Sequence, residues 1–431
     1  PTSYLGARER VYPLGLARLA GLVEEKGQIS ALDMNLYADP WPVLKDQLLS
    51  FEPDLAVLSF RNLDPLAGHQ TSYLSALKTT ATLVHSLLPQ TRILSGGPAF
   101  SLFAERLMQE IPQIDAGIIG EGELAFARLL KSFPDFEGLP GTVMRKPDSL
   151  QQTVRPRFID LDELPRLDDL TFAPANYLQG NAYVAALGIE GKRGCDLSCA
   201  YCVYPCLGGG RMRLRDPQKI VDEMQFLSQE HAVNLFHFTD PVLNRPADHF
   251  EAICRELKRR KLDIQWTGFF REDTLSKEQL LLARDAGLIA VYFSADALTE
   301  HGLKVLNKKM DKQNVLNASR LTAECGMLTM CHFLCNLPGE TPALIQEAWQ
   351  TLDQILEIHA TAGNLGAVIF NTVRLYPEAP LTRKLLREGL LDPEVDLLYP
   401  VYYNPPSHAH ILHELETHCH AAGVFSRLNL H

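Results

Sequence analysis

The stretch that decides the fold is Gly194–Cys202, GCDLSCAYC, which follows an apolar run at residues 183–190 that is expected to be a strand. Its cysteines, Cys195, Cys199 and Cys202, have the spacing C-x3-C-x2-C. Each iron of a [4Fe–4S] cluster needs a ligand from outside the cluster. Three thiolates in one short loop can therefore hold three irons and leave the fourth open to a small molecule. The sequence predicts an iron–sulfur site at the end of this strand.

Cys206 allows other interpretations of the same loop. A structural zinc ion could take all four cysteines, although zinc sites usually place cysteine pairs on separate knuckles. A ferredoxin-like cluster could use Cys206 as its fourth thiolate. We favour a third interpretation, in which Cys206 is an ordinary cysteine beside the pocket.

The second part of the chain alternates strand and helix patterns. Strands are expected over residues 183–190, 234–240, 264–270, 290–296, 328–336 and 367–375. This alternation predicts a partial (β/α)6 TIM-type barrel over residues 181–385, with its chemistry at the carboxyl ends of the strands. A small, mostly helical C-terminal cap is expected over residues 386–431. Cys331 and Cys335 share one face of a strand, and we expect them to face the barrel interior.

The first part of the chain alternates in the same way. Strands are expected over residues 29–33, 54–60, 92–97 and 116–119. Helices are expected over residues 14–26, 41–50, 72–88, 101–111 and 122–132. The pattern predicts a doubly wound, Rossmann-like α/β domain over residues 1–135, whose first strand is expected to precede Pro1. Residues 136–180, rich in Pro and Asp, are expected to be a surface linker.

Ligands of doubly wound domains bind at the carboxyl ends of the strands. Small and polar residues stand at these ends here: Ser59, Arg61, Asn62, Gly96, Gly97, Gly120 and Glu121. Glycines at such places let a large ligand approach the backbone closely.

Composition excludes some classes of partner. The 431 residues carry a formal net charge of -11, which argues against a nucleic-acid backbone as the main partner. No apolar run approaches the roughly 18–20 residues needed to span a bilayer. Nine cysteines, three of them crowded into one loop, suit a metal site in a reducing cytosol better than a disulfide framework.

Four more motifs follow the cysteine loop in order. They are FHFTDPVLN (236–244), VYFSADALTEHGLKVLNKKM (291–310), FLCNLPGET (333–341) and RLYPEAPL (374–381). With GCDLSCAYC, in which Tyr201 is the aromatic residue before the third cysteine, they resemble the radical S-adenosylmethionine superfamily. Asn336 stands in place of the first glycine of the family's G-x-P-G-E-T motif.

The resemblance implies roles for several residues. Asp240 falls where the family contacts the methionyl amine, and Ser294 and Asp296 could bind the ribose or carboxylate of S-adenosylmethionine. Lys308 and Arg271 are expected in loops at the barrel mouth, where either could bind a substrate carboxylate. Candidates for direct participation in catalysis are Tyr292, Tyr376 and Arg271.

The first domain also resembles a known one. YPLGLARLAGLVEEKG (12–27), PDLAVLSF (53–60), LSGGPAF (94–100) and GIIGEGELAFARLL (117–130) look like the cobalamin-binding domain that precedes the barrel in one large subgroup. The usual cobalamin-ligating D-x-H-x-x-G is absent. Residues 59–64, SFRNLD, resemble a stretch in the tryptophan C2-methyltransferases of thiopeptide biosynthesis and their relatives, where the arginine, here Arg61, lies beneath cobalt.

The resemblance implies an enzyme with a [4Fe–4S] cluster, S-adenosylmethionine and cobalamin. The leading expectation is methyl transfer to a small-molecule biosynthetic intermediate, with an electron donor such as flavodoxin or ferredoxin as partner. The alternative is the same scaffold without methylation: 3-amino-3-carboxypropyl transfer, cyclisation or ring contraction. A first domain that has lost cobalamin and a non-catalytic sensor are the remaining possibilities.

Overall fold

The computed structural model describes residues 10–23, 27–65, 70–155, 158–178 and 187–426. These residues form two compact units, one up to residue 178 and one from residue 187 onward. Both are α/β units, so the expected fold class is confirmed. No helix within the described ranges is long and apolar enough to cross a membrane.

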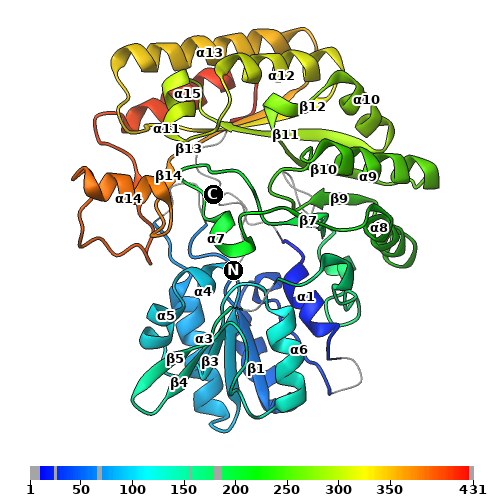
Figure 1. Cartoon of the computed structure of the whole chain (residues 1–431), viewed down its shortest axis with the longest axis vertical. Coiled ribbons are helices and arrows are strands. Elements are labelled where there is room, and N and C mark those ends of the chain that lie inside the picture. Colours follow the sequence, from blue (N-terminus) through cyan, green and yellow to red (C-terminus); the bar gives the residue numbers. More distant parts are fainter. Residues whose placement is uncertain (1–9, 24–26, 66–69, 156–157, 179–186, 427–431) are drawn as a thin grey trace. The chain divides into compact units, whose positions relative to one another are not determined.

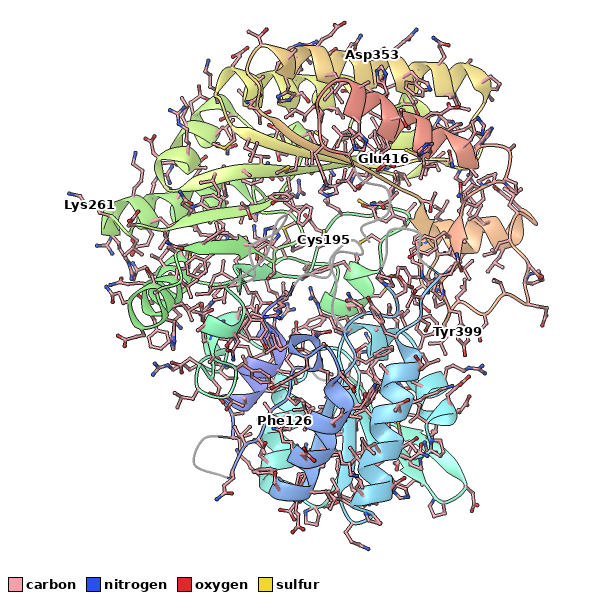
Figure 2. All side chains as sticks on the ribbon, turned by 180° about the vertical axis from the view of Figure 1, so that it is seen from behind. Phe126, Cys195, Lys261, Asp353, Tyr399 and Glu416 are labelled. Carbon is pink, nitrogen blue, oxygen red and sulfur yellow. The ribbon has the colours of Figure 1, made fainter. Side chains whose placement is uncertain are left out.

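The first unit, blue to cyan in Figure 1, is built on a five-stranded sheet in the order β1-β2-β3-β4-β5. The strands β1 (Leu55–Ser59), β2 (Arg92–Gly96) and β3 (Ala116–Ile118) are parallel. Its helices are α1 (Leu14–Ala20), α2 (Pro40–Phe51), α3 (Leu74–Leu87), α4 (Pro98–Leu102), α5 (Ala104–Glu110) and α6 (Glu123–Ser132). Leu94 and Ile118 pack against Phe126 and Leu129 of α6 in its core (Figure 2 labels Phe126).

Three expectations for this unit were wrong. Residues 29–33 form no strand: Ile29 is exposed, and the Asp33 carboxylate caps a short 3₁₀ helix, η2 (Met34–Leu36). The helix expected over 101–111 is divided at Phe103 into α4 and α5. The stretch expected to be linker adds β4 (Thr142–Lys146) and β5 (Ser149–Gln152), which extend the sheet in antiparallel fashion.

The second unit, green to red in Figure 1, has a six-stranded parallel sheet in the order β13-β12-β11-β10-β9-β6. Its strands are β6 (Leu187–Ile189), β9 (Leu235–Phe238), β10 (Gln265–Phe270), β11 (Leu288–Asp296), β12 (Leu328–Leu334) and β13 (Leu365–Asn371). Since neighbours in the sheet are successive strands of this series, the unit is the expected partial barrel. Of the strand expected at 183–190, residues 183–186 lie outside the described part.

Helices follow the strands of this unit. They include α8 (Pro217–His231), α9 (Ala247–Arg260), α10 (Lys277–Asp285), α11 (Glu300–Val305), α12 (Lys312–Glu324), α13 (Pro342–Ala360) and α14 (Pro380–Arg387). On the helix-facing side, Trp266 of β10 packs edge-to-face against Phe238 and Phe250, and its indole donates to the Ala286 carbonyl (2.9 Å). The expected C-terminal cap contains α15 (Ala409–Ala421), and the Val368 amide of β13 donates to the Phe425 carbonyl (2.9 Å).

A substitution at Gly97 would test how tightly the carboxyl ends of the strands pack in the first sheet. The φ of Gly97 is +105°, and a Cβ there would lie 2.7 Å from the Phe60 carbonyl oxygen. We expect Gly97→Ala to lower the stability of this unit by about 1–3 kcal/mol, a fall of roughly 3–10 °C in Tm measured by circular dichroism. Gly120→Ala is the matched control, because φ is +89° there but nothing lies within 4 Å. Equal losses in the two variants would contradict a role for the clash.

Candidate active site

The three cysteines lie in one loop of the second unit, between β7 (Lys192–Arg193) and α7 (Tyr204–Gly208). Cys195 is buried (labelled in Figure 2), and Cys199 and Cys202 are half-buried. The loop closes through a hydrogen bond from the Cys195 amide to the Gly209 carbonyl (3.0 Å). Only glycine fits position 194, where φ is +80° and a Cβ would lie 2.1 Å from the Arg211 carbonyl oxygen.

Backbone hydrogen bonds join this loop to distant segments of the same unit. The Ala200 amide donates to the Leu306 carbonyl, and the Leu381 amide donates to the Ala200 carbonyl, both at 2.8 Å. Asn307 donates through its side-chain amide to the Ser198 carbonyl (2.6 Å). The loop that carries the cysteines is therefore fixed from the segment after β11 and from the start of α14.

A cluster would bind the cysteine side chains as thiolates. All nine cysteines lie in the described part of the chain, and all are thiols. Burial raises the pKa of Cys195 and Cys199, and raises that of Cys202 to about 12. Iron would thus have to displace the protons. Among the described residues, no three Cys, His, Asp or Glu side chains stand close enough together to hold a metal ion as they are placed, the three cysteines of the loop included.

Asp240 follows β9 and is almost fully buried. Its Oδ1 accepts hydrogen bonds from the backbone amides of Gly191 (2.7 Å) and Lys192 (3.1 Å), whereas its Oδ2 has no hydrogen-bond partner among the described residues. The Lys192 ammonium is 3.9 Å from Oδ2 but donates instead to the carbonyls of Val242, Leu243 and Arg245. Burial raises the pKa of Asp240 to about 6. One carboxylate oxygen thus remains for a donor from a ligand.

Tyr201, Asp296 and Lys308 form one hydrogen-bonded group. The Tyr201 hydroxyl donates to Asp296 Oδ2, which also accepts from the Lys308 ammonium (2.6 Å). The same ammonium donates to the Ser294 carbonyl (2.5 Å). The structure therefore brings together all four of these residues. Lys308 lies in a loop, as expected, and is only 5% exposed, with its ammonium already bound to Asp296 and Ser294.

Arg271, in the loop that follows β10, is also buried. Its guanidinium makes two hydrogen bonds to the Asp273 carboxylate (2.6 and 2.9 Å) and another to the Lys308 carbonyl. Its backbone amide donates to Asn244 Oδ1 (2.8 Å). These contacts make Arg271 a link between the segments that follow β9, β10 and β11.

Tyr292 belongs to a cluster of rings contributed by four neighbouring strands, β9 to β12. Its ring lies 5.5 Å from that of His237, 5.6 Å from Phe269 and 6.3 Å from His332. Burial lowers the pKa of both histidines, that of His237 to about 3, so both are neutral. Sequence reasoning missed the histidines. Along β9 and β12, each histidine alternates with residues that face the helices, and this period of two could have identified both histidines as inward-facing.

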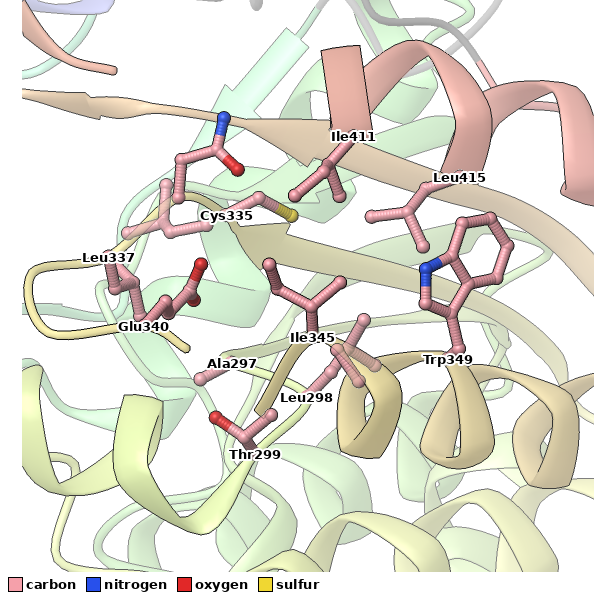
Figure 3. A pocket seen from close by; sticks show the side chains of 13 residues that line it. Ala297, Leu298, Thr299, Cys335, Leu337, Glu340, Ile345, Trp349, Ile411 and Leu415 are labelled. Atoms are coloured by element: carbon pink, nitrogen blue, oxygen red, sulfur yellow. The ribbon is translucent and has the colours of Figure 1, made fainter. Parts of the chain in front are cut away.

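A further correction concerns two cysteines that were expected to face the barrel interior. His332 of β12 faces the ring cluster, so its neighbour Cys331 points to the opposite, helix-facing side. Cys335, directly after β12, lies beside residues of α13 and α15 (Figure 3). Tyr376 follows β14 (Val373–Arg374) and is half-buried, with the Arg374 guanidinium 4.9 Å from its ring centre.

Glu272 is a second residue that the sequence did not single out. It follows β10, is 4% exposed, and neither carboxylate oxygen accepts a hydrogen bond from another described residue. Burial raises its pKa to about 7.

In the first unit, the expected ligand-binding residues lie at the carboxyl ends of parallel strands. Ser59 ends β1 and pairs with Gly96, which ends β2. Ser59 and Arg61 are exposed, while Asn62 and Glu121 are half-buried. No atom lies within 4 Å of the place where a Cβ would stand on Gly120, whereas Gly97 is tightly packed. Open backbone beside exposed polar residues fits a large ligand at this edge, as cobalamin would require.

Curated relatives of the chain include a methyltransferase and a cyclase. The chain is 25% identical to the cytidylyl-2-hydroxyethylphosphonate methyltransferase of Streptomyces wedmorensis, over 91% of this chain and 81% of that protein. It is 26% identical to the anaerobic magnesium-protoporphyrin IX monomethyl ester cyclase of Rubrivivax gelatinosus, over 78% of this chain. The match spans only 61% of the cyclase.

A solved structure has a similar fold. The radical S-adenosylmethionine methyltransferase TsrM from Kitasatospora setae superposes with a TM-score of 0.80, covering 98% of this chain and 91% of that one, at 19% identity.

Two family models match the chain in succession. The B12 binding domain matches residues 6–130, and the radical SAM superfamily matches residues 189–354. The first match falls on the unit with open strand ends, and the second contains the cysteine loop, Asp240 and the group around Asp296. The chain belongs to the cobalamin-dependent radical S-adenosylmethionine enzymes, whose cofactors are a [4Fe–4S] cluster, S-adenosylmethionine and cobalamin.

Proposed function

We propose that this enzyme transfers the methyl group of S-adenosylmethionine to a small-molecule biosynthetic intermediate. The observation that carries the proposal is the cysteine loop beside a buried Asp240, one oxygen of which lacks a donor among the described residues, in a chain that also holds a cobalamin-type domain. The methyltransferase relative supports methyl transfer because it covers nearly the whole chain. The shorter cyclase match keeps non-methylating chemistry as the second candidate.

Each group of residues has a proposed task. Cys195, Cys199 and Cys202 hold the cluster, which supplies an electron for cleavage of a sulfonium carbon–sulfur bond when bound. The open Oδ2 of Asp240 accepts a hydrogen bond from the methionyl ammonium. The joint hydrogen bonds of Tyr201 and Lys308 to Asp296 hold the cysteine loop against the end of β11, which makes these three residues positioning residues for the cofactors.

The remaining proposals concern the other cofactor contacts and the partners. Ser294, beside Asp296, is placed to contact the ribose or carboxylate. Cobalamin would lie along the carboxyl ends of the first sheet, against the expected residues there: Ser59, Arg61, Asn62, Gly96, Gly97, Gly120 and Glu121. A flavodoxin or ferredoxin would supply the electron, and the nine thiols suit a reducing compartment such as the cytosol.

Product analysis separates the two candidate functions. The chain, reconstituted without oxygen with iron, sulfide and cobalamin, would be given S-adenosylmethionine, a reductant and an extract of small metabolites. S-adenosylhomocysteine, with or without 5'-deoxyadenosine, supports methyl transfer. Methylthioadenosine, or 5'-deoxyadenosine alone with no cobalamin retained, contradicts it and favours aminocarboxypropyl transfer or rearrangement.

The cluster assignment predicts different effects for neighbouring cysteines. Cys199→Ala removes one of three proposed ligands, and we expect most of the iron and all cleavage of S-adenosylmethionine to be lost. Cys206→Ala, in helix α7 directly after the loop, is the matched control, and this variant should keep its iron. Iron and sulfide content after anaerobic reconstitution measures both. Equal loss in the two variants would favour the four-cysteine alternative.

The Asp240 assignment predicts pH-dependent binding. The raised pKa, about 6, means that Asp240 is increasingly protonated below that pH, where it can no longer attract an ammonium group. We expect S-adenosylmethionine to bind more weakly at pH 5.5 than at pH 7.5, as measured by equilibrium dialysis of the cluster-loaded enzyme.

Asp240→Asn tests the same assignment at constant pH. Loss of a charge-assisted hydrogen bond should weaken binding at pH 7.5 by about ten- to hundred-fold and remove the pH dependence. Asp285→Asn, at the exposed end of α10, is the control and should change neither. Unaltered affinity in Asp240→Asn would place the ammonium elsewhere.

A further inference from the structure

Lys192 is a charged residue whose side chain is entirely buried, with 0% of it exposed. It stands in β7, three residues before Cys195, and no motif of the sequence gives it a role. Lysine side chains are almost never fully buried unless they are paired, because an ammonium group loses its hydration at a large cost in free energy. The partners of this lysine therefore indicate why it is there.

The hydrogen bonds of the Lys192 side chain show that it is an ammonium group. Its nitrogen donates to three backbone carbonyls, those of Val242 (3.2 Å), Leu243 (2.9 Å) and Arg245 (2.6 Å). An ammonium group has three N–H donors, whereas a neutral amine has only two and would turn its lone pair toward a carbonyl oxygen. Burial lowers the pKa of Lys192, but these three acceptors favour the charged form. The side chain is thus a fixed positive charge inside the unit.

This charge lies beside the carboxylate of Asp240. The Lys192 nitrogen is 3.9 Å from Asp240 Oδ2, and both side chains are 0% exposed. The ammonium donates its hydrogen bonds to the carbonyls, so Oδ2 has no hydrogen-bond partner within the described ranges. The two charges still attract each other strongly, because hardly any water separates them. Lys192 therefore acts on Asp240 through its charge and leaves Oδ2 open to another donor.

Other titratable groups near Asp240 do not supply this charge. Glu190 would oppose the ionisation of Asp240, but its carboxylate is paired with the Arg193 guanidinium through two hydrogen bonds (2.7 and 3.0 Å). Tyr204 of α7 is neutral, because burial raises the pKa of its hydroxyl. Among the described residues, Lys192 is therefore the cation that stabilises the charge on Asp240.

Asp240 needs such a cation in order to be ionised near pH 7. Burial favours the neutral form of a carboxyl group, and Asp240 is only 1% exposed. Even beside Lys192, burial raises the pKa of Asp240 to about 6. Without the positive charge this pKa would rise further, and most of the carboxyl group would be protonated at neutral pH. A protonated carboxyl group attracts an amine far less than a carboxylate does.

We propose that Lys192 is a positioning residue, which keeps the Asp240 carboxylate ionised, with Oδ2 open, for the methionyl amine of S-adenosylmethionine. The inference rests on the proposed function, because it takes from there the role of Asp240. The same lysine also fixes residues 242–245. Arg245 of that segment pairs with Asp196 of the cysteine loop (2.8 Å), so Lys192 connects the amine site with the loop.

Lys192→Gln removes the charge and keeps two N–H donors for the carbonyls. Infrared spectroscopy of the cluster-loaded enzyme, without S-adenosylmethionine, would follow the carbonyl band of protonated Asp240, identified as the band that Asp240→Asn lacks. We expect the band to titrate at about pH 6 in the wild-type enzyme. In Lys192→Gln the midpoint should lie about one pH unit or more higher. An unchanged midpoint in the folded variant would overturn the proposal.

Two further measurements keep the test decisive if Lys192→Gln does not fold. Lys192→Met, which is apolar and of similar length, is a second neutral variant with the same expected shift. In the wild-type enzyme itself, a midpoint well above pH 7 would overturn the proposal, because Asp240 would then be protonated despite the lysine. Lys258→Gln is the matched control: its exposed partner is Asp285 of α10, and the midpoint of Asp240 should not change.

Binding of S-adenosylmethionine separates this inference from the proposed function. In equilibrium dialysis, the pH at which the affinity falls to half of its plateau should move upward in Lys192→Gln as the infrared midpoint does. Each variant is compared with its own plateau, because loss of a cation beside the amine site also changes the affinity at high pH. A purely structural role would lower Tm and leave both midpoints in place, which would contradict the proposal. A shifted infrared midpoint with an unshifted binding profile would contradict the proposed role of Asp240 instead.

Discussion

The proposed chemistry depends on how the cysteine loop is anchored to the ends of the barrel strands. The Ala200 peptide accepts one hydrogen bond and donates another, to residues more than 100 positions further along the chain. The adjacent Tyr201 reaches Asp296, which Lys308 holds in place. A loop with three thiols and little regular structure would otherwise be mobile. These bonds fix the backbone of the loop before any iron arrives, so that binding the cluster would have to order only the cysteine side chains.

Around this anchor, the carboxyl ends of the strands carry buried acceptors that the protein leaves partly unsatisfied. Within the described ranges, one oxygen of Asp240 and both oxygens of Glu272 have no hydrogen-bond donor. Their pKa values are raised because burial removes water without supplying enough donors. For Asp240, the proposed methionyl ammonium would restore the missing interaction. The lysine beside it cannot do so, since its ammonium is already engaged with three backbone carbonyls. The free energy that the unsatisfied carboxylate costs the empty enzyme would thus be recovered when the cofactor binds.

The sequence predicted most strands of both units and the residues of the cysteine loop, because strong apolar patterns and local spacing determine these. The prediction failed where the structure depends on strand pairing and contacts between residues far apart in the sequence. Residues 29–33 look like a strand but end in an aspartate that caps a turn, and the hairpin around Lys146 to Ser149 was hidden by short, polar strands, although its Pro-Asp turn was a usable signal. The bond from Tyr201 to Asp296 spans 95 residues and could not be read from the sequence. The burial of Lys308 and Arg271 likewise follows from contacts with residues far away in the sequence.

Three cysteines of one loop are proposed to hold a four-iron cluster with one iron that no cysteine binds. Mössbauer spectroscopy of the enzyme reconstituted with ⁵⁷Fe tests this assignment most directly. We expect about four irons per chain in one cluster, with a single iron distinguishable from three similar ones, and the same pattern in Cys206→Ala. Four equivalent irons in the wild-type enzyme, with loss of the cluster in Cys206→Ala, would contradict it.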